Sequence, residues 1–574
     1  MFRPHQARAA AGVMAVAWAF ASPPVAHSQT FNPMPRTSTV DANGVDLVNW
    51  SWSHQVGSIS LGPPGKGLVS VVIDLPSERD SFSTNMRIED PTWTNSTRVT
   101  ATFGSKTWLI MGWGVEGDPS SSFSIDIGQP YQTIYDGDGS IIEFEDPYPY
   151  QTSTKNLCAA RITRPDGEVL TFYNKAGLFP CRAQSIVSNR GYQIKYEYPS
   201  ASAFKRSKII IINNAYEYCN PTADTCSLTM DWPSVTLSTS MPTTYATNDG
   251  RTWILSAGGL QSPGETTPGI QWTTQTYLAP NVVGTYDWRV TSVTRDGQTW
   301  TYSYPSSDSL LGGGSGSLIR VQDPLGNAAR HRRSPGMSGG DPTTGEYSLP
   351  NLLVKSANEL GNVREYTYNS TNLLESVTLP EGNKHIATYN SQGNLATHTL
   401  QAKPGSGLAN IITSASYTTS GSYVYCNQPA SITDARGNTT TYTYHPTHCG
   451  VLTETLPADA NGVQAVNRYA YAQRYAWTKN SSGGYSQAAT PVWVLSSMKS
   501  CRTSATVGSG CAAGASDEIT VTYDYGPNSG PNILWVRGQV VTADGVSLRT
   551  CYAYDRLGNK ISETSPRAGL TSCP

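Results

Sequence analysis

The sequence predicts an all-β protein built from antiparallel β-hairpins, and two recurring patterns carry that prediction. The first pattern is a Tyr-x-Tyr pair, which occurs ten times in 574 residues. Because alternate residues of a strand point to the same face, each pair places two rings on one side of a sheet. The second pattern is a Gly-Asn or Asp-Gly step, whose residues tolerate the positive φ angles of hairpin turns. The nine pairs on which the prediction rests are Tyr196/Tyr198, Tyr216/Tyr218, Tyr302/Tyr304, Tyr366/Tyr368, Tyr423/Tyr425, Tyr442/Tyr444, Tyr469/Tyr471, Tyr523/Tyr525 and Tyr552/Tyr554.

The two patterns combine into a repeat. In the clearest unit, Tyr552–Pro566, a Tyr-x-Tyr strand leads into a Gly-Asn turn and a returning strand. Gly361 and Gly382 are 21 residues apart, and so are Tyr368 and Tyr389. This spacing fits a two-stranded rung with its turns, since strands typically have about 5–6 residues. Gly-Asn steps occur at Gly326-Asn327, Gly361-Asn362, Gly382-Asn383, Gly393-Asn394, Gly437-Asn438 and Gly558-Asn559.

A degenerate form of the repeat precedes the regular one. Asp-Gly turns stand shortly before an aromatic residue, and we expect each to be a hairpin turn. The turns are Asp138-Gly139, Asp166-Gly167, Asp249-Gly250 and Asp296-Gly297, and the aromatic residues that follow them are Phe144, Phe172, Trp253 and Tyr302.

The unit Tyr552–Pro566 resembles, almost position for position, the YD repeat of RHS and teneurin-type proteins. Asn358–Pro380 and Thr433–Pro457 match this repeat well, and Arg161–Tyr198 and Thr294–Pro305 match it loosely. The resemblance implies that the repeats coil into a β-sheet spiral, which in the family closes into a hollow shell. In bacterial members the shell often encloses a toxic C-terminal domain. The repeat-structural positions that the match singles out are Tyr366, Tyr368, Tyr442, Tyr444, Tyr552, Tyr554, Gly361, Gly382, Gly437 and Gly558.

The chain departs from the toxin-delivering members of that family. They carry an Asp-Pro-x-Gly-Leu core signature, whereas Asp323–Asn327 reads Asp-Pro-Leu-Gly-Asn, an ordinary repeat turn. The match is therefore to the N-terminal portion of such a protein, an open or partial shell without the core and toxin region. An array that ends mid-spiral leaves an unpaired strand edge. We expect either that another chain caps this edge or that the sequence is a truncated product.

Four regions are expected along the chain. Residues 1–28 read as a secretory signal, with basic residues, a short apolar run and a small-residue cleavage site. Residues 29–150 form an N-terminal β-rich region, residues 151–310 hold degenerate repeats, and residues 311–574 hold the regular array with loop insertions. The prediction is a protein that is secreted, periplasmic or displayed at the cell surface, with no transmembrane segment in the mature chain.

Ten cysteines fit an exported protein. Their spacing predicts five sequential disulfides, three of which span close to one repeat period, although spacing alone leaves other connectivities open. The predicted pairs are Cys158/Cys181, Cys219/Cys226, Cys426/Cys449, Cys501/Cys511 and Cys551/Cys573.

Composition argues against nucleic-acid binding. Charged residues make up 14 % of the chain, the formal net charge is −2, and no sustained basic stripe occurs.

Two short motifs resemble catalytic or metal-binding sites but lack the flanking residues that such sites need. Gly336–Gly340 matches a nucleophile elbow but has neither the preceding strand nor the following helix. Asp136 and Asp138 begin like a calcium loop, yet the twelfth position is Pro147, so a hairpin turn is favoured and a loose calcium site stays open.

Two further groups of side chains resemble functional sites. His445, His448 and Cys449 are soft ligands close together, but a zinc site needs a fourth ligand and Cys449 has a likelier partner in a disulfide. A glycosidase pair among Glu143, Glu145 and Asp146 has nothing to fix its separation. No catalytic, cofactor-binding or metal-binding residue is therefore assigned, and no cofactor is expected.

The sequence favours a secreted, non-enzymatic scaffold or interaction protein: the front part of an RHS-type shell or a cell-surface adhesin. Its partner would be a protein that completes the spiral or a cell-surface glycan. The alternative is an exported carbohydrate-binding or carbohydrate-active protein that uses its tyrosines and tryptophans. Amphipathic rings suit sugar stacking, but packing within the sheet is the commoner role of such rings.

Overall fold

The computed structural model describes most of the chain beyond residue 38. The described residues are 39–48, 50–62, 68–75, 79–80, 84–89, 98–103, 106–111, 114–116, 123–127, 132–136, 139–145, 154–175, 181–238, 240–278, 286–312, 317–334, 352–370, 373–391, 393–417 and 427–574. The signal-like segment 1–28, Gly336–Gly340, Asp138 and Asp146 lie outside them.

The fold is all-β, as predicted, and antiparallel throughout. The described residues contain two short 3₁₀ helices, η1 (Ala515–Asp517) and η2 (Pro566–Ala568), and no α-helix. No helix among them is long and apolar enough to cross a bilayer. The first strands are β1 (His54–Leu61), β2 (Val69–Leu75), β3 (Arg79–Asp80), β4 (Thr84–Glu89), β5 (Arg98–Phe103), β6 (Lys106–Met111), β7 (Gly114–Glu116), β8 (Phe123–Ile127), β9 (Gln132–Asp136), β10 (Ile141–Glu145), β11 (Thr154–Thr163), β12 (Val169–Asn174), β13 (Ala183–Ser188), β14 (Tyr192–Glu197) and β15 (Lys208–Asn213).

The array continues strand by strand to the C-terminal region. Its middle strands are β16 (Ser234–Leu237), β17 (Thr243–Thr247), β18 (Thr252–Ser256), β19 (Gly259–Gln261), β20 (Ile270–Leu278), β21 (Tyr286–Arg295), β22 (Gln298–Ser303), β23 (Leu318–Gln322), β24 (Ala328–Arg333), β25 (Leu353–Ala357), β26 (Val363–Tyr368), β27 (Leu374–Thr378), β28 (Lys384–Tyr389), β29 (Leu395–Gln401) and β30 (Ile411–Tyr417). Its last strands are β31 (Pro429–Thr433), β32 (Thr439–Tyr444), β33 (Val451–Ala458), β34 (Gln464–Arg474), β35 (Trp477–Lys479), β36 (Tyr485–Gln487), β37 (Val492–Cys501), β38 (Thr506–Val507), β39 (Gly510–Cys511), β40 (Glu518–Asp524), β41 (Gly538–Ala543), β42 (Val546–Tyr554) and β43 (Lys560–Glu563).

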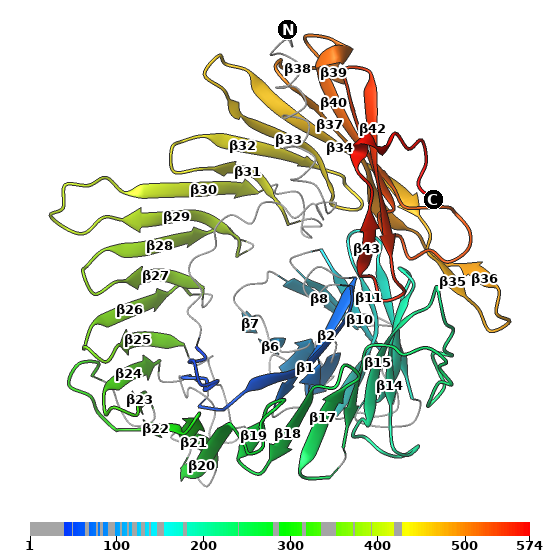
Figure 1. The fold of residues 1–574 in the computed structure, drawn as a ribbon. Coiled ribbons are helices and arrows are strands. Elements are labelled where there is room, and N and C mark those ends of the chain that lie inside the picture. The colour runs from blue at the N-terminus through cyan, green and yellow to red at the C-terminus, as the bar shows by residue number, and fades with distance from the viewer. Residues whose placement is uncertain are drawn as a thin grey trace.

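One long sheet follows the chain and curls into a ring (Figure 1). From β8 to β34 each strand pairs with its sequence neighbours, and the path then runs through β37, β40, β41 and β42 to β43. The sheet branches at β11, which pairs with β10 on one side and with both β12 and β4 on the other. The strands β1–β3 form a separate small sheet inside the curl, with β1 in contact with β15, β16 and β17.

The hairpin turns have a common construction. In Asp434–Asn438, the Asp434 carboxylate accepts hydrogen bonds from the backbone N–H groups of Arg436 and Asn438 at 2.8 and 2.9 Å. The Gly437 N–H then donates to the Asp434 carbonyl, and Gly437 has φ +84°. Only the glycine is left-handed. The following Asn438 instead donates its side-chain amide to Asp434 at 2.9 Å, so its role is hydrogen bonding rather than the positive φ expected from sequence.

The two faces of the sheet have different chemistry. In the described strands the tyrosine pairs face inward, where Tyr302 is 3 % exposed and Tyr366 is 7 % exposed. Tyr216/Tyr218 instead follows β15 outside any strand, with Tyr218 39 % exposed, and Tyr423/Tyr425 lies outside the described residues. The residue between the two tyrosines faces outward and meets a hydroxyl on the neighbouring strand, as in Thr367–Ser376 at 2.7 Å. The same outward hydroxyl pairing recurs at Thr388–Thr397, Ser416–Ser431 and Thr443–Thr453. The inner face therefore carries the core of the protein, and the outer face is polar, with hydroxyls and the occasional ion pair such as Lys355–Glu365 at 2.6 Å.

Candidate functional site: inner wall, seam and loops

The second tyrosine of a pair hydrogen-bonds to the backbone of the neighbouring strand. Tyr444 donates its hydroxyl to the Pro429 carbonyl at 2.7 Å. Pro429 lies at a β-bulge, because the register shifts where Tyr417 pairs with it. A bulge disrupts the hydrogen-bond ladder locally, so the tyrosine satisfies a backbone acceptor at the interruption. We call this contact the tyrosine cap.

The tyrosine cap recurs along the array. It joins Tyr198 to Ala183, Tyr304 to Val290, Tyr368 to Leu353, Tyr389 to Leu374, Tyr417 to Leu395, Tyr525 to Leu495 and Tyr554 to Val536, at 2.6–3.1 Å. In all of these except the last, the accepting residue lies at a register shift. Tyr471 is an exception, since its buried hydroxyl has no hydrogen-bond partner and its ring packs on His448.

Burial keeps these phenols neutral. It raises the pKa of Tyr389 to about 12, and burial with the nearby Glu454 raises the pKa of Tyr442 to about 12. A neutral hydroxyl can donate a hydrogen bond, which is what the tyrosine cap requires. In the described strands the rings of the pairs lie on the inner face, where they act in packing.

An N-terminal segment, here called the strap (residues 39–48 and 50–62), lies along the inner wall (Figure 1). Tyr302 donates to Asp41 at 2.7 Å and accepts from Asn43 at 3.0 Å. The Trp50 ring is 2 % exposed, and the guanidinium groups of Arg289 and Arg333 lie 4.0 and 3.4 Å from its centroid. Such cation–π contacts are stronger away from water. The strap is therefore fixed to strands of the middle of the array.

The spiral closes on itself at a second contact, here called the seam. Hairpin turns of β11–β15 meet the segments around β35–β37 and β42–β43. The Trp493 N–H donates to the Asp166 carbonyl at 2.7 Å, and the Lys479 N–H donates to the Asn214 carbonyl at 2.7 Å. The Asn189 amide donates to the Thr490 hydroxyl at 3.0 Å. The second circuit of the spiral thus rests on the first, and residues roughly 300 positions apart become neighbours.

The strap and the seam meet at the last hairpin. The Gly62 N–H donates to the Leu557 carbonyl at 2.5 Å, and the Asn213 amide donates to the Arg556 carbonyl at 3.0 Å. A Cβ on Gly558 would lie 2.8 Å from the Trp535 ring and 3.0 Å from the Gly62 nitrogen. The three parts of the chain are packed so closely here that only glycine fits.

A buried carboxylate reinforces the first-circuit side of the seam. Glu168 is 3 % exposed, and it accepts from Ser188 at 2.7 Å, from Tyr192 at 2.8 Å and from Arg164 at 2.9 Å. Burial and the adjacent Glu168 raise the pKa of Tyr192. A buried charge needs such partners to be tolerated, and the group is a structural anchor beneath the seam, shielded from solvent.

Cysteine pairs close four loops. Disulfides join Cys158 to Cys181, Cys219 to Cys226, Cys501 to Cys511 and Cys551 to Cys573, with Cα atoms 5.4–5.6 Å apart. This separation is usual for disulfides. Cys449 is also disulfide-bonded, and Cys426 lies outside the described residues.

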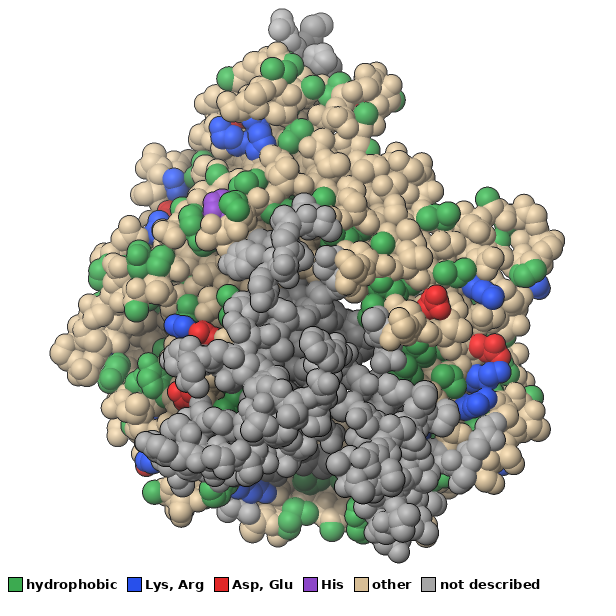
Figure 2. Space-filling view, turned by 180° about the vertical axis from the view of Figure 1, so that it is seen from behind, with side chains coloured by type: hydrophobic (Ala, Val, Ile, Leu, Met, Phe, Trp, Pro, Cys, Tyr) green, Lys and Arg blue, Asp and Glu red, His purple; other side chains and the backbone are tan. Residues whose placement is uncertain are grey.

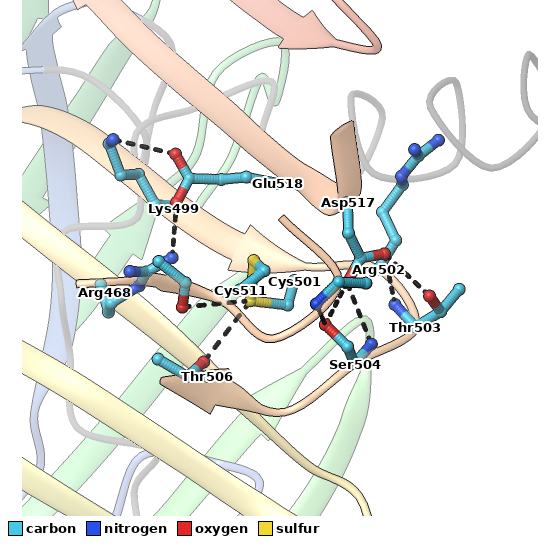
Figure 3. Close-up of a disulfide and its surroundings, with 12 residues drawn as sticks. Arg468, Lys499, Cys501, Arg502, Thr503, Ser504, Thr506, Cys511, Asp517 and Glu518 are labelled. Atoms are coloured by element: carbon cyan, nitrogen blue, oxygen red, sulfur yellow. Dashed lines mark hydrogen bonds and ion pairs between the residues drawn. A yellow bond between two sulfur atoms is a disulfide. The ribbon is translucent and has the colours of Figure 1, made fainter. Parts of the chain in front are cut away.

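The loop between β37 and β40 contains β38, β39 and η1 (Figure 3). Asp517 is 5 % exposed and accepts hydrogen bonds from the backbone and hydroxyl groups of Thr503 and Ser504. Burial alone would raise the pKa of Asp517, but the hydrogen bonds from Ser504 and Thr503 lower it. Cys501, Cys511 and Asp517 place three potential metal-ligand atoms within 4.8 Å. Both sulfurs are in the Cys501–Cys511 disulfide, and the Asp517 carboxylate accepts four hydrogen bonds from Thr503 and Ser504. The group therefore acts as a latch that holds the two ends of the loop together.

The sequence-level site candidates fall into structural roles. The His445 and His448 rings stack 3.9 Å apart, and the Nδ1 atom of His448 accepts from the Gly450 N–H at 3.1 Å. Burial and the neighbouring His445 lower the pKa of His448 to about 4. Glu143 binds Arg161 through both oxygens, at 2.5 and 2.9 Å. These contacts place His445, His448 and Glu143 in structural interactions with their neighbours.

Surface charge is sparse on the face in Figure 2, where charged side chains among the described residues lie in small mixed groups. The exposed aromatic side chains include Trp288, which is 69 % exposed. A single exposed ring of this kind is weaker evidence for a carbohydrate platform than a row of rings would be.

Comparisons with known proteins found distant likenesses. No family model matches the sequence, and no curated protein matches it. Among solved structures, "Crystal Structure of TcdB2-TccC3 without hypervariable C-terminal region" matches with 12 % identity over 87 % of this chain and 28 % of that chain, at a TM-score of 0.27. A "Photorhabdus luminescens Tc holotoxin pore" structure matches with 11 % identity over 87 % of this chain and 26 % of that chain, at a TM-score of 0.32. The chain thus spans under a third of those chains, and likenesses this distant do not assign an activity.

Sequence reasoning missed three of the features above. The strap gave no signal because its residues lack the repeat. The seam joins segments that are far apart in the sequence, and no local pattern reports it. The tyrosine cap had a partial signal, namely that the second tyrosine tends to stand 15 residues after its acceptor, as Tyr368 does after Leu353 and Tyr444 does after Pro429.

Proposed function

We propose that this chain is an exported, non-enzymatic scaffold that builds the wall of a β-shell and binds a protein partner. The observation that carries the proposal is the seam, because a sheet that completes a circuit and rests on its own first turns encloses an interior. The YD-like repeat supports the shell, and the signal-like segment 1–28 supports export. The titratable clusters described above are occupied by structural contacts, which supports a role without catalysis.

A crosslink across the seam tests the enclosure. In the full chain, Asn189→Cys together with Thr490→Cys should form a disulfide under mild oxidation, because the Asn189 amide and the Thr490 hydroxyl are 3.0 Å apart. The matched control pairs Asn189→Cys with Asn461→Cys, whose partner position lies on another turn of the array. Failure of the seam pair to crosslink in the folded protein would contradict the closed circuit.

Export and the lack of activity are tested separately. Fusion of residues 1–28 to a reporter that is active only outside the cytoplasm should give signal, and replacing Arg3 and Arg8 with Glu should reduce it. The purified chain should hydrolyse neither glycosides nor esters. A hydrolytic activity that survives repurification would contradict the scaffold proposal.

A further inference from the structure

Two histidines on neighbouring strands face each other on the inner wall. β28 and β29 pair antiparallel, with Ala387 opposite His398 and His385 opposite Leu400. His385 and His398 are therefore diagonal partners on the face that carries Ala387, which is 2 % exposed. Diagonal neighbours of this kind are within reach of aromatic and long side chains. The two strands lie on the opposite side of the ring from the seam (Figure 1).

The nitrogen atoms of this pair are at the separation that a metal ion needs. The Nδ1 atom of His385 and the Nε2 atom of His398 are 3.2 Å apart. Zinc–imidazole bonds are about 2.0–2.1 Å long, so two nitrogens on a tetrahedral ion lie about 3.3 Å apart. The pairing of β28 with β29 thus holds two potential ligand atoms at a chelating distance.

Without an ion, the same two atoms form a hydrogen bond between the rings. One ring donates an N–H to the other, so only one of the facing nitrogens carries a free lone pair. Metal binding requires both lone pairs, which a change of tautomer provides: the donor ring carries its proton on its other nitrogen, and both rings stay neutral. Burial lowers the pKa of His385, and burial with the neighbouring His385 lowers the pKa of His398. The lowered pKa values favour the neutral form, which is the form that binds metals.

We propose that His385 and His398 form a site for a late first-row divalent metal ion such as Ni²⁺, Cu²⁺ or Zn²⁺. Imidazole nitrogens suit these ions, whereas Ca²⁺ and Mg²⁺ prefer oxygen ligands. Among the described residues, the one group of three or more potential ligands is Cys501, Cys511 and Asp517, so no third such ligand joins the histidines. Water fills the remaining positions, and the ion links β28 to β29 on the inner wall.

A second histidine pair in the chain provides a matched control. The His445 and His448 rings stack with their centroids 3.9 Å apart and their planes 9° apart. Stacked rings do not point their nitrogens at one another, and the Nδ1 atom of His448 already accepts from the Gly450 N–H. This pair should not chelate an ion, although its rings are closer together than those of His385 and His398, whose centroids are 5.4 Å apart.

Calorimetric titration of the full chain with NiCl₂ tests the site, using protein that carries no polyhistidine tag. We expect a saturable binding step in the parent protein. This step should be lost in His385→Gln and in His398→Gln, and it should remain in His445→Gln. Survival of the step in His385→Gln, its loss in His445→Gln, or no saturable binding by the parent protein at millimolar Ni²⁺ would overturn the proposal.

Because a variant that misfolds also loses binding, the parent protein gives a second readout. An ion bound to both rings stabilises the pairing of β28 with β29, so the amide hydrogens of these strands should exchange more slowly when Ni²⁺ is present. The amides of β32 and β33, which flank the control pair, should exchange at the same rate with and without the ion. Unchanged exchange in β28 and β29 at saturating Ni²⁺, or slowing in β32 and β33 instead, would overturn the proposal.

Discussion

At the scale of single residues, the two tyrosines of a pair have different roles. The first ring packs in the inner wall, and the hydroxyl of Tyr442 has no hydrogen-bond partner. The second ring also caps a bulge, as Tyr444 does for Pro429 at 2.7 Å. Tyr442 and Tyr444 look alike in the sequence, yet only Tyr444 holds the neighbouring strand by a hydrogen bond. In other pairs the first tyrosine bonds to a side chain instead, as Tyr469 does to Glu454 and Tyr552 does to Gln539.

Tyr444→Phe should therefore destabilise the rung by about 1–3 kcal/mol, because it leaves a backbone acceptor without a partner. Tyr442→Phe should change stability by much less, since no hydrogen bond is lost. Hydrogen exchange of β31 and β32 amides measures the local effect in a repeat protein better than a global melt. Equal protection in the two variants would contradict the distinct roles.

A single residue, Trp50, anchors the strap to the inner wall through its burial and its contacts with Arg289 and Arg333. Trp50→Ala should cost about 3–5 kcal/mol, because a fully buried tryptophan and its two arginine contacts are lost. Trp288→Ala is the control, since that ring is 69 % exposed and should contribute little. Urea unfolding followed by circular dichroism checks both. Similar midpoints for the two variants would show that the strap does not hold the wall.

Sequence reasoning at this scale was right about packing and silent about capping. Tyr366 and Tyr442 are buried on the inner face, which alternation along a strand predicts. The partner of Tyr444 depends on where the next strand bulges, and a bulge is set by the pairing of two strands rather than by either one. A single strand's sequence therefore does not specify it.

At the scale of elements, the turn glycines divide into two kinds. Gly437 and Gly558 both have positive φ, at +84° and +87°. A Cβ on Gly437 would meet nothing within 4 Å, whereas a Cβ on Gly558 would meet Trp535 and Gly62. The first glycine serves its own hairpin, and the second also allows the seam to close.

Gly437→Ala should cost about 1–2 kcal/mol, the strain of a left-handed backbone with a side chain. Gly558→Ala should cost more, because the same strain is joined by a clash with Trp535 and the Gly62 backbone. Unfolding midpoints compare the two, and the Asn189–Thr490 crosslink reports whether the seam opens. If the two substitutions cost the same, the tight contact at the last hairpin is absent.

The loop in Figure 3 should respond to acid. Hydrogen bonds lower the pKa of Asp517, so its contribution to stability is present above the ordinary carboxyl pKa of about 4 and is lost as the pH falls through the lowered value. Limited proteolysis should find residues 502–516 protected at pH 7 and cleaved at pH 2–3. Asp517→Asn should allow cleavage at both values. Protection of that variant at pH 7 would contradict the latch.

At the scale of the whole molecule, the repeat predicted a spiral but neither its circumference nor its interior. Local patterns such as the turn at Gly437 fix each rung. The bond between Trp493 and Asp166 depends on the summed curvature of all the rungs between them. The strap carries no repeat, so its place on the inner wall follows from the apolar groups of Trp50 and Trp52 and from the hydrogen bonds to Tyr302. The seam contacts and the position of the strap therefore cannot be predicted from the sequence of any short segment.

The seam also limits how the gene can change. In a repeat protein each rung contacts only its neighbours, so the fold of the other rungs can survive the gain or loss of one repeat of about 21 residues. Loss or duplication of one rung between Asp166 and Trp493 would leave every remaining hairpin intact, yet it would bring the wrong turns together where the circuits meet. Drift in the individual repeats is thus tolerated, while their number within one circuit should be held fixed by selection.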